Sequence, residues 1–570
     1  MRAAVSLLTC LISGLLLALA FPRTGIWPLA WVALVPWLFI VFTASWPVAI
    51  GGSWLAGFAF FASLMYWIAI FGYLPWALAA LIEGFSFAAT AALARAMAPR
   101  SGWRVLAVGL AWVTWEFARG LGEFGVTWGQ LGHSQAPVVA LAQLAAFGGV
   151  PAISFVVIVT SAALAHAMAD GRTRRGAYQP LMWAAAFAVI AIALGAAHAR
   201  LVERAIRADP STLRPIRQAP FDSAQGRQGK PAQGRPEPSR GATGSLRLRS
   251  GQAGSARASS RADWRSPVRV GIAQASLKTW LTVEQLSAAL TPQQQSDELS
   301  TYARLTRQAA ARGAAVVVWP ESAVPGYLEY EGLIREGVTS LARELGVWLV
   351  VGGPAYEGAG DYNSAYVISP EGKITARYDK VHLVPFGEYV PWRKWLPLLR
   401  HYRVRETDLG RGKRHHLLHV GELAVGPMIC FESVFPYISR SEANRGAQAL
   451  VIITNDAWFL RTAAAAQHMQ IGRFRAIEEG LYVARGAATG ISCFFDPLGR
   501  VMDSLPLMKR GVIVADIHPR AADTLYRRVG PVFSAACAGV ALAWAAAALA
   551  RRRRQRGSQG PLQRGGARWG

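Results

Sequence analysis

The chain has 570 residues, of which 52% are hydrophobic and 21 are Trp. This composition is too apolar for an ordinary soluble enzyme of this length, so we expect an integral membrane protein with more than one domain. The formal net charge of +26 could indicate a nucleic-acid ligand. No nucleic-acid-binding signature accompanies the basic residues, so we assign their charge to membrane topology and a linker and expect no nucleic-acid partner.

Residues 1–200 are predicted to form a seven-span transmembrane domain, because a span takes about 20 mostly apolar residues. The predicted spans are residues 4–20, 26–44, 48–71, 76–98, 103–119, 145–168 and 181–199. An eighth transmembrane helix is predicted over residues 531–550, directly before Arg551–Arg554. Basic loops mark the cytoplasmic side of a membrane. The Arg clusters at 95–104, 172–175 and 551–554 fall on one side with this count, which leaves residues 200–530 outside the cytoplasm.

Two basic segments flank the remaining domain. Residues 201–266 are predicted to be a basic, low-complexity linker, rich in Gly, Ser, Ala, Gln, Pro and Arg. Residues 551–570 form a basic cytoplasmic tail.

Within the fifth span, Glu116 and Arg119 lie three positions apart, which predicts an ion pair between them near the outer interface.

Residues 267–520 read as an α/β domain. Predicted helices cover 296–312, 333–345 and 463–479. Predicted strands cover 268–273, 314–319, 348–352, 366–369, 373–378, 425–430, 449–454, 483–488 and 492–495. Strands that alternate with helices and also form hairpins indicate a layered sheet sandwich with helices outside.

Three chemically useful residues lie at or just past predicted strand ends. They are Glu321 in Trp319-Pro-Glu-Ser322, Lys380 in Tyr378-Asp-Lys-Val-His382, and Cys430 in Met428-Ile-Cys-Phe-Glu432. A Cys thiolate attacks carbonyl carbon and needs a nearby base or positive charge for activation. Glu321 could accept the proton, and Lys380 could stabilise the oxyanion that forms. The trio therefore predicts acyl transfer.

These three motifs resemble the signature motifs of the nitrilase (carbon-nitrogen hydrolase) superfamily. The Leu383–Pro391 run after Lys380 and the preceding spans are most similar to its membrane-bound branch, the apolipoprotein N-acyltransferases. The resemblance implies an α-β-β-α sandwich in which Glu321 is the general base, Lys380 the transition-state stabiliser and Cys430 the nucleophile.

The reaction implied by the resemblance has two steps. Cys430 takes an acyl chain from a phospholipid, phosphatidylethanolamine being the expected donor, and then passes it to the α-amine of the S-diacylglyceryl cysteine of an apolipoprotein. The chemistry requires no metal, and we expect no cofactor. The expected location is the bacterial inner (cytoplasmic) membrane, with the catalytic domain on the periplasmic side.

Five further residues are candidates for binding substrate or supporting the site. Glu388 and Glu432 could hold the lysine, bind substrate or form structural salt bridges. Trp280, Tyr389 and Trp458 could line an acyl or headgroup pocket, or simply pack in the core. We expect His468 to serve helix packing or capping. His415, His416 and His419 lack a ligand partner at metal-binding spacing, so we predict no metal site there.

Two other functions remain open at this stage. A membrane-tethered amidase or nitrilase-type hydrolase would use the same three residues with water in place of the amine, although a tether needs only one span. A transporter with an external sensor domain would need paired polar residues in several spans, and only Glu83, Glu116 and Arg119 are visible.

Overall fold

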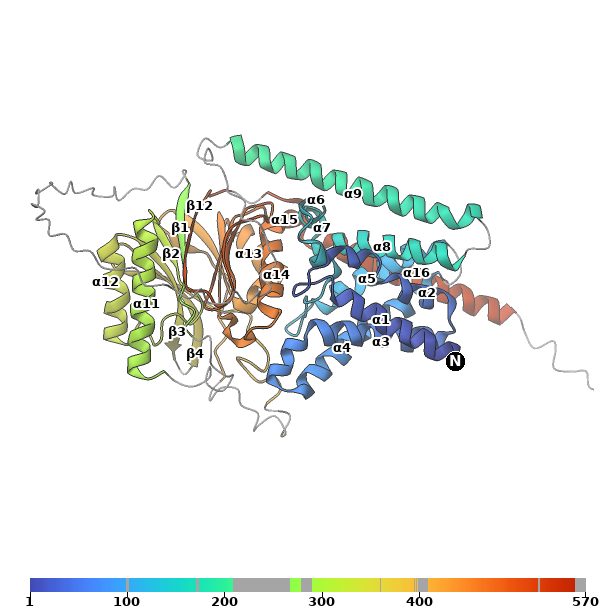
Figure 1. The fold of residues 1–570 in the computed structure, drawn as a ribbon, viewed down its shortest axis with the longest axis horizontal. Coiled ribbons are helices and arrows are strands. Elements are labelled where there is room, and N and C mark those ends of the chain that lie inside the picture. The colour runs from blue at the N-terminus through green and yellow to red at the C-terminus, as the bar shows by residue number, and fades with distance from the viewer. Residues whose placement is uncertain are drawn as a thin grey trace, which may run out of the picture.

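The computed structural model describes residues 1–98, 102–170, 174–208, 267–277, 290–358, 360–393, 395, 397, 408–520 and 523–558. A helical part and an α/β part lie side by side, and helix α9 runs along both (Figure 1). Most of the predicted linker, the end of the basic tail and Trp280 lie outside the described residues.

The helical part confirms the apolar segments as helices. They are α1 (Arg2–Ala18), η1 (Trp27–Trp31), α2 (Val35–Thr43), α3 (Trp46–Leu64), η2 (Tyr66–Phe71), α4 (Tyr73–Met97), α5 (Arg104–Arg119), η3 (Leu131–Gln135), α6 (Val139–Ala142), α7 (Ala145–Gly148), α8 (Val150–Ala169), α9 (Arg174–Ala208) and α16 (Val532–Ser558). Among the described residues, five helices are long and apolar enough to cross a membrane, namely α3, α4, α8, α9 and α16. The three other predicted spans are the shorter α1, η1 with α2, and α5, so the count of eight stays a prediction.

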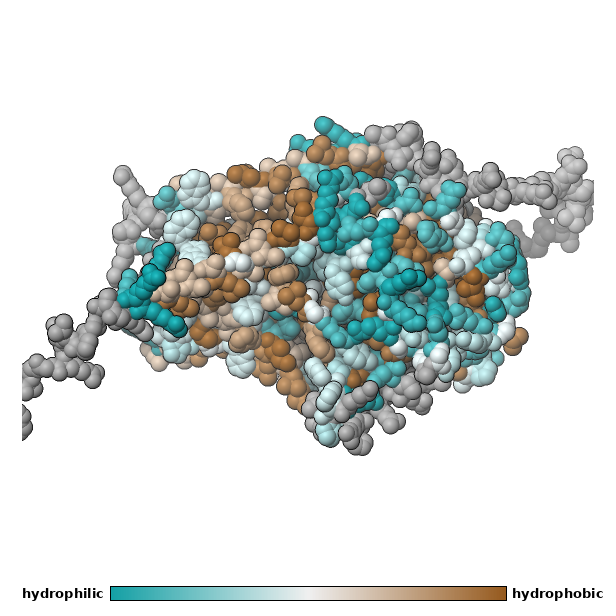
Figure 2. All heavy atoms as spheres, turned by 180° about the vertical axis from the view of Figure 1, so that it is seen from behind, coloured by the Kyte–Doolittle hydropathy of each residue, from teal (hydrophilic) through white to brown (hydrophobic). Residues whose placement is uncertain are grey.

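The surface of the molecule divides in the same way. Apolar residues gather over the helical part, whereas polar residues dominate the sandwich (Figure 2). Exposed Leu, Ile, Phe and Trp side chains on α4 and α9, such as Ile82, Trp183 and Ile190, would be costly in water but are stable against lipid. The helical part is therefore the membrane domain.

Helices α3 and α4 pack at unusually close range through two glycines. A Cβ placed on Gly57 would lie 2.3 Å from the carbonyl oxygen of Gly84, and a Cβ on Gly84 would lie 2.6 Å from the backbone nitrogen of Phe58. Small residues at such crossings let two helix backbones approach in a bilayer, where helix association relies on close packing. This contact holds α3 and α4 together. The end of α3, at Leu64, faces the sandwich.

The α/β part contains two six-stranded sheets. The first sheet has the order β12-β1-β2-β3-β4-β5 and the second has the order β11-β10-β9-β8-β7-β6. The strands are β1 (Val268–Gln274), β2 (Val316–Val318), β3 (Trp348–Glu357), β4 (Gly360–Ile368), β5 (Ile374–Asp379), β6 (Leu418–Val420), β7 (Leu423–Ile429), β8 (Ala449–Thr454), β9 (Val483–Ala487), β10 (Ser492–Phe495), β11 (Val501–Leu505) and β12 (Gly511–Ile517). Within each sheet three central strands run parallel, β1–β3 and β7–β9.

Alternation along the strands builds the layers. On β2, Val316 and Val318 enter the core between the sheets, while Val317 faces the helices α11 (Pro292–Ala311) and α12 (Gly332–Leu345). The second sheet carries α13 (Pro436–Asn444) and α14 (Ala464–Glu479) on its outer side, between that sheet and the membrane helices (Figure 1). The predicted α-β-β-α sandwich is confirmed. Sequence analysis gave no range for β6, β11, β12 or α13.

The close contact of α3 and α4 predicts that Gly57→Ala will destabilise the membrane domain. The new methyl group must push the α4 backbone away, and overpacking of this kind costs about 1–3 kcal/mol. Gly51→Ala is the matched control, because it adds the same methyl group to the same helix with no heavy atom within 4 Å. Thermal unfolding of the detergent-solubilised protein should show a lower midpoint for Gly57→Ala alone. Equal midpoints for the two variants would contradict the contact.

Candidate active site

The structure brings the three predicted residues to one edge of the sandwich. Glu321 follows β2 and Lys380 follows β5, both in the first sheet, while Cys430 follows β7 in the second sheet. Lys380 Nζ lies 2.9 Å from Glu388 Oε1 and 3.6 Å from Glu321 Oε1. The lysine side chain is only 1% exposed, so its charge is compensated almost entirely by these two carboxylates.

Asn363 on β4 joins the two carboxylates and was missed by sequence analysis. Its amide nitrogen donates to Glu321 Oε1 at 2.7 Å and to Glu388 Oε1 at 3.0 Å. The backbone carbonyl of Asn363 accepts a hydrogen bond from the backbone N–H of Lys380 at 2.8 Å. Asn455 completes the set, because its backbone N–H donates to Glu321 Oε2 at 2.6 Å. Glu321 is therefore held at both oxygens.

The two supporting glutamates have different partners. Glu388 holds Lys380 and also accepts from the backbone N–H of Val384 at 2.8 Å. Glu432 is fully buried and accepts from the backbone N–H groups of Val381 and Ile429, at 2.8 and 2.7 Å, and from the Tyr378 hydroxyl at 3.0 Å. Glu432 thus ties the loop after Lys380 to the strand that ends at Cys430, and its burial leaves no face for substrate.

Cys430 begins the short η6 turn (Cys430–Val434) with φ of +55°. A side chain other than glycine pays a steric cost in this left-handed region, which persists only where the surroundings hold the backbone in place. Ser322, next to Glu321, has the same conformation with φ of +57°. Cys430 is a free thiol and remains partly exposed. The turn therefore places Cys430 at the end of β7, beside Glu321 and Lys380.

The charges around the thiol keep it protonated. Burial raises the pKa of Cys430 well above its ordinary value, the nearby Glu321 carboxylate raises it further, and Lys380 only partly opposes them. Burial alone would lower the pKa of Lys380, but Glu388, Glu321 and Cys430 raise it above its ordinary value. Lys380 is therefore a buried cation beside a thiol that holds its proton more firmly than an ordinary cysteine does.

The predicted aromatic residues are spread around the site. The Tyr389 hydroxyl donates to Glu123 Oε1 at 2.8 Å, and Glu123 belongs to the membrane-domain loop that follows α5. Trp458 lies half-buried in the η7 turn (Asp456–Phe459) after β8. These positions leave the pocket-lining role of Tyr389 and Trp458 a prediction.

Two predictions about polar residues missed the main partners. His468 packs in the core as expected, but its ring nitrogens also lie within hydrogen-bond distance of Asp456 Oδ1 and Ser433 Oγ, at 3.0 and 2.9 Å. Arg119 does not pair with Glu116 but with Glu83 of α4, at 2.7 Å. The sequence signal for both was local spacing on one helix, whereas the partners come from other segments. The described residues, which include His415, His416 and His419, contain no group of three or more side chains that could hold a metal ion.

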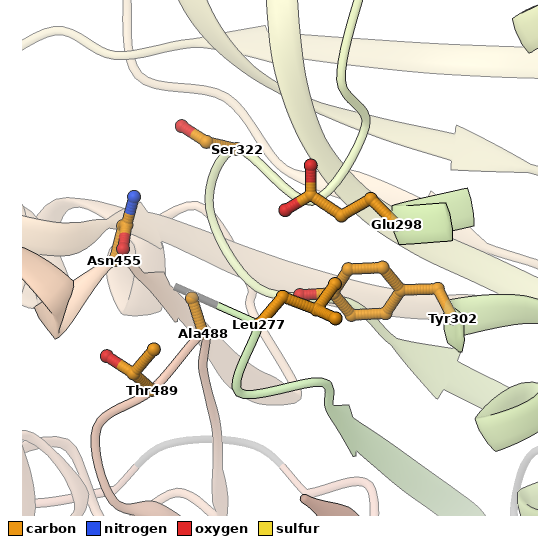
Figure 3. A pocket seen from close by; sticks show the side chains of 7 residues that line it. All are labelled: Leu277, Glu298, Tyr302, Ser322, Asn455, Ala488 and Thr489. Atoms are coloured by element: carbon orange, nitrogen blue, oxygen red, sulfur yellow. The ribbon is translucent and has the colours of Figure 1, made fainter. Parts of the chain in front are cut away.

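A small pocket lies next to Ser322, the residue that follows Glu321 (Figure 3). Ser322 and Asn455 enter it from the two loops that flank Glu321, Glu298 and Tyr302 from α11, and Thr489 from the turn after β9. Its lining mixes these polar side chains with the apolar Leu277 and Ala488.

Comparison with known proteins identifies both parts of the chain. The carbon-nitrogen hydrolase family matches residues 269–526, and the apolipoprotein N-acyltransferase N-terminal domain matches residues 13–163. A relative from Geobacter metallireducens named apolipoprotein N-acyltransferase is 31% identical over 563 residues, which cover 96% of this chain and 95% of the relative. The chain belongs to the apolipoprotein N-acyltransferase family. It is therefore an acyltransferase of the carbon-nitrogen hydrolase superfamily and a bacterial membrane protein.

Other similar proteins occur among curated relatives and solved structures. An apolipoprotein N-acyltransferase from Rhodopseudomonas palustris is 27% identical, with 91% of each chain covered. Among solved structures, an amidase from Nesterenkonia sp. is 20% identical and covers 47% of this chain and 94% of its own, with a TM-score of 0.35.

The ion pairs of Lys380 predict a pH-dependent loss of stability in Lys380→Met. Without the cation, two buried carboxylates remain uncompensated, which costs about 3–5 kcal/mol. Burial raises the pKa of Glu388, but Lys380 lowers it below its ordinary value in the native enzyme. In the variant this pKa rises, so Glu388 takes up a proton as the pH falls and the penalty shrinks.

Thermal unfolding of the variant and the native enzyme between pH 8 and pH 5 checks this expectation. The gap in midpoint should be widest at pH 8 and narrow toward pH 5. Lys413→Met is the control, because Lys413 is exposed and its 3.8 Å pair with Glu357 contributes little. A gap that does not change with pH would mean that the carboxylates are not compensated by Lys380.

Proposed function

We propose that this enzyme transfers an acyl chain from a phospholipid to the α-amine of the S-diacylglyceryl cysteine of apolipoproteins, through a thioester on Cys430. The observation that carries the proposal is the position of the Cys430 turn against the membrane domain. The Thr127 hydroxyl, in the loop between α5 and η3, donates to the carbonyl of Val434 at 2.8 Å. A membrane lipid and a membrane-anchored amine can both reach a nucleophile at this boundary.

In the first step, Cys430 Sγ attacks the carbonyl carbon of a phospholipid ester while Glu321 accepts the thiol proton. Lys380 stabilises the negative charge on the carbonyl oxygen. The carbon–oxygen ester bond then breaks, the departing lysophospholipid oxygen takes the proton from Glu321, and the acyl chain remains as a thioester. The firmly held proton of the thiol and the buried cation on Lys380 support this assignment of roles.

In the second step, the neutral α-amine of the acceptor attacks the thioester carbon. Glu321 accepts a proton from the amine, the carbon–sulfur bond breaks, and the Cys430 sulfur regains its proton. The product is an amide, which is more stable than the thioester. The reaction needs no cofactor, and the protein supplies positioning and charge stabilisation.

The proposed reaction also has a specific acyl donor and a specific location in the cell. We assign phosphatidylethanolamine as the donor and the inner membrane as the location, with the sandwich on the periplasmic side. The run Arg551–Arg554 supports this orientation because α16 carries it away from the sandwich, at the opposite end of the membrane domain (Figures 1 and 2). The chain then consists of the membrane domain (1–200), the linker (201–266), the catalytic domain (267–520), the last span (531–550) and the tail (551–570).

Incubation of the purified enzyme with phosphatidylethanolamine should give a Cys430 peptide that is heavier by one acyl group in mass spectrometry. A diacylglyceryl lipopeptide added next should remove the acyl group and gain an amide. Cys430→Ala should give neither product. Cys493→Ala, which changes a fully buried thiol on β10 of the same sheet, should retain both. Free fatty acid released at the same rate without the lipopeptide would instead indicate a hydrolase.

Glu321→Gln should slow thioester formation by about 100- to 10,000-fold, the usual contribution of a general base. The substitution keeps the size of the side chain and one acceptor oxygen but cannot take up the thiol proton. Glu336→Gln is the control, because Glu336 is exposed on α12 and pairs only with Arg343 among the described residues. Single-turnover measurement of the Cys430 adduct separates the two variants. Unchanged formation in Glu321→Gln would remove Glu321 from the role of base.

A further inference from the structure

A buried polar cluster lies behind Cys430 and takes no part in the proposed chemistry. We call it the His468 cluster, and it consists of Ser433, Asp456, His468 and Arg485, each less than 2% exposed. His468 Nε2 lies 3.2 Å from the carbonyl oxygen of Cys430 and 2.9 Å from Ser433 Oγ. Ser433 Oγ itself donates to the same carbonyl at 2.8 Å. Two side chains therefore converge on the backbone oxygen of the nucleophile.

Both ring nitrogens of His468 lie close to a hydrogen-bond acceptor. The Cys430 carbonyl can only accept a hydrogen bond, so a bond to it from His468 uses a proton on Nε2. On the other side of the ring, Nδ1 lies 3.0 Å from Asp456 Oδ1 and 3.1 Å from Arg485 Nη2. Asp456 and Arg485 form an ion pair at 3.0 Å. The ring is thus fixed at both nitrogens, with Nε2–H aimed at Cys430.

The membrane domain reaches the same ring. Trp128, in the loop between α5 and η3, stacks on His468 with 5.9 Å between ring centroids and 29° between planes. Its indole N–H donates to Gln467 Oε1 at 2.7 Å. The Gln467 amide nitrogen in turn donates to the carbonyls of Pro22 and Leu64, at 3.1 and 3.2 Å. The start of α14 is therefore held to the membrane domain at Pro22, Leu64 and Trp128.

We propose that His468 is a positioning residue for the nucleophile, and that Trp128 holds it in place from the membrane domain. The left-handed backbone at Cys430 is unfavourable by itself and needs partners that fix it. The hydrogen bond from His468 Nε2 to the Cys430 carbonyl supplies one, and stacking by Trp128 keeps the ring on that carbonyl. Docking of the membrane domain and the geometry of the thiol are then linked. The inference rests on Cys430 being the nucleophile.

Two substitutions of His468 separate its two nitrogens. The Nε2 of Gln reaches about as far as Nε2 of His, so His468→Gln keeps a donor for the Cys430 carbonyl. The Nδ2 of Asn reaches only as far as Nδ1, so His468→Asn keeps the Asp456 side and loses the donor to Cys430. Both variants remain polar and of similar volume, which matches them for folding.

The expected result is a selective loss of rate in His468→Asn. Single-turnover thioester formation on the full-length enzyme in detergent should slow by about tenfold or more, with KM for phosphatidylethanolamine within about twofold of the native enzyme. His468→Gln should recover to within about threefold of the native rate. Equal rates in His468→Asn and the native enzyme would overturn the proposal. So would equal losses in both variants together with lowered unfolding midpoints, because these indicate a role in stability alone.

Hydrogen–deuterium exchange gives a readout that does not depend on acyl transfer. Backbone amides between residues 429 and 436 should exchange faster in His468→Asn than in His468→Gln, with α12 as an unchanged internal reference. If the native enzyme forms no thioester, the proposed function fails, and exchange alone then decides the positioning role. Unchanged exchange around Cys430 in His468→Asn would overturn it.

The link to the membrane domain is tested at Trp128 in the same assay. Trp128→Phe retains a ring over His468, whereas Trp128→Leu removes it and keeps an apolar side chain. Exchange at residues 429–436 should rise in Trp128→Leu and stay near the native rate in Trp128→Phe. Equal exchange in the two variants would restrict the positioning role to His468 and overturn the part assigned to Trp128.

Discussion

The buried charge of Lys380 is the interaction on which the rest of the site depends. Moving an ammonium group out of water costs several kcal/mol, and this loss is offset only if opposite charges meet it with good geometry. Glu388 and Glu321 provide those charges, and the Asn363 amide keeps both oxygens in place. These four residues come from the ends of β2 and β5, from β4 and from the loop after Lys380, so the site requires the whole first sheet in register. Because Cys430 ends a strand of the second sheet, the trio also requires that the two sheets pack together.

The same electrostatics determine how the nucleophile can be used. Burial disfavours the thiolate and raises the pKa of Cys430 above its ordinary value, and the Glu321 carboxylate raises it further against the opposing effect of Lys380. A protonated thiol is a poor nucleophile, and it is also slow to oxidise or to react with stray electrophiles. Attack must therefore be coupled to proton transfer. Glu388 forms the shorter ion pair with Lys380, so the proposed reaction uses Glu321 as the base and gives the two glutamates different tasks.

Sequence reasoning found those residues that carry a local signal. Glu321, Lys380 and Cys430 each end an apolar run, and strand ends in a layered α/β domain meet at one edge, so their proximity could be predicted. Asn363 has no such signal, because it lies inside β4 and only the pairing of β4 with β5 sets it beside Lys380. Predictions of long-range partners failed for the same reason. Arg119 was paired with its helical neighbour rather than with Glu83 on another helix, and the partners of His468 come from three separate segments.

The way in which the two domains pack gives the membrane part more than an anchoring role. In the sandwich, α13 and α14 cover the second sheet, and the other side of α14 packs against the membrane domain (Figure 1). Phe474 and Ile477 of α14 share one apolar cluster with Leu141 and Val150 of the membrane domain. Burial of this kind contributes roughly 25 cal/mol for each Å² removed from water, so the interface stabilises the sandwich as well as locating it. The turn that carries Cys430 lies between this layer and the core of the second sheet. The membrane domain therefore contacts this turn directly, through the Thr127 hydroxyl and the Val434 carbonyl, which suits an enzyme whose two proposed substrates arrive through the bilayer.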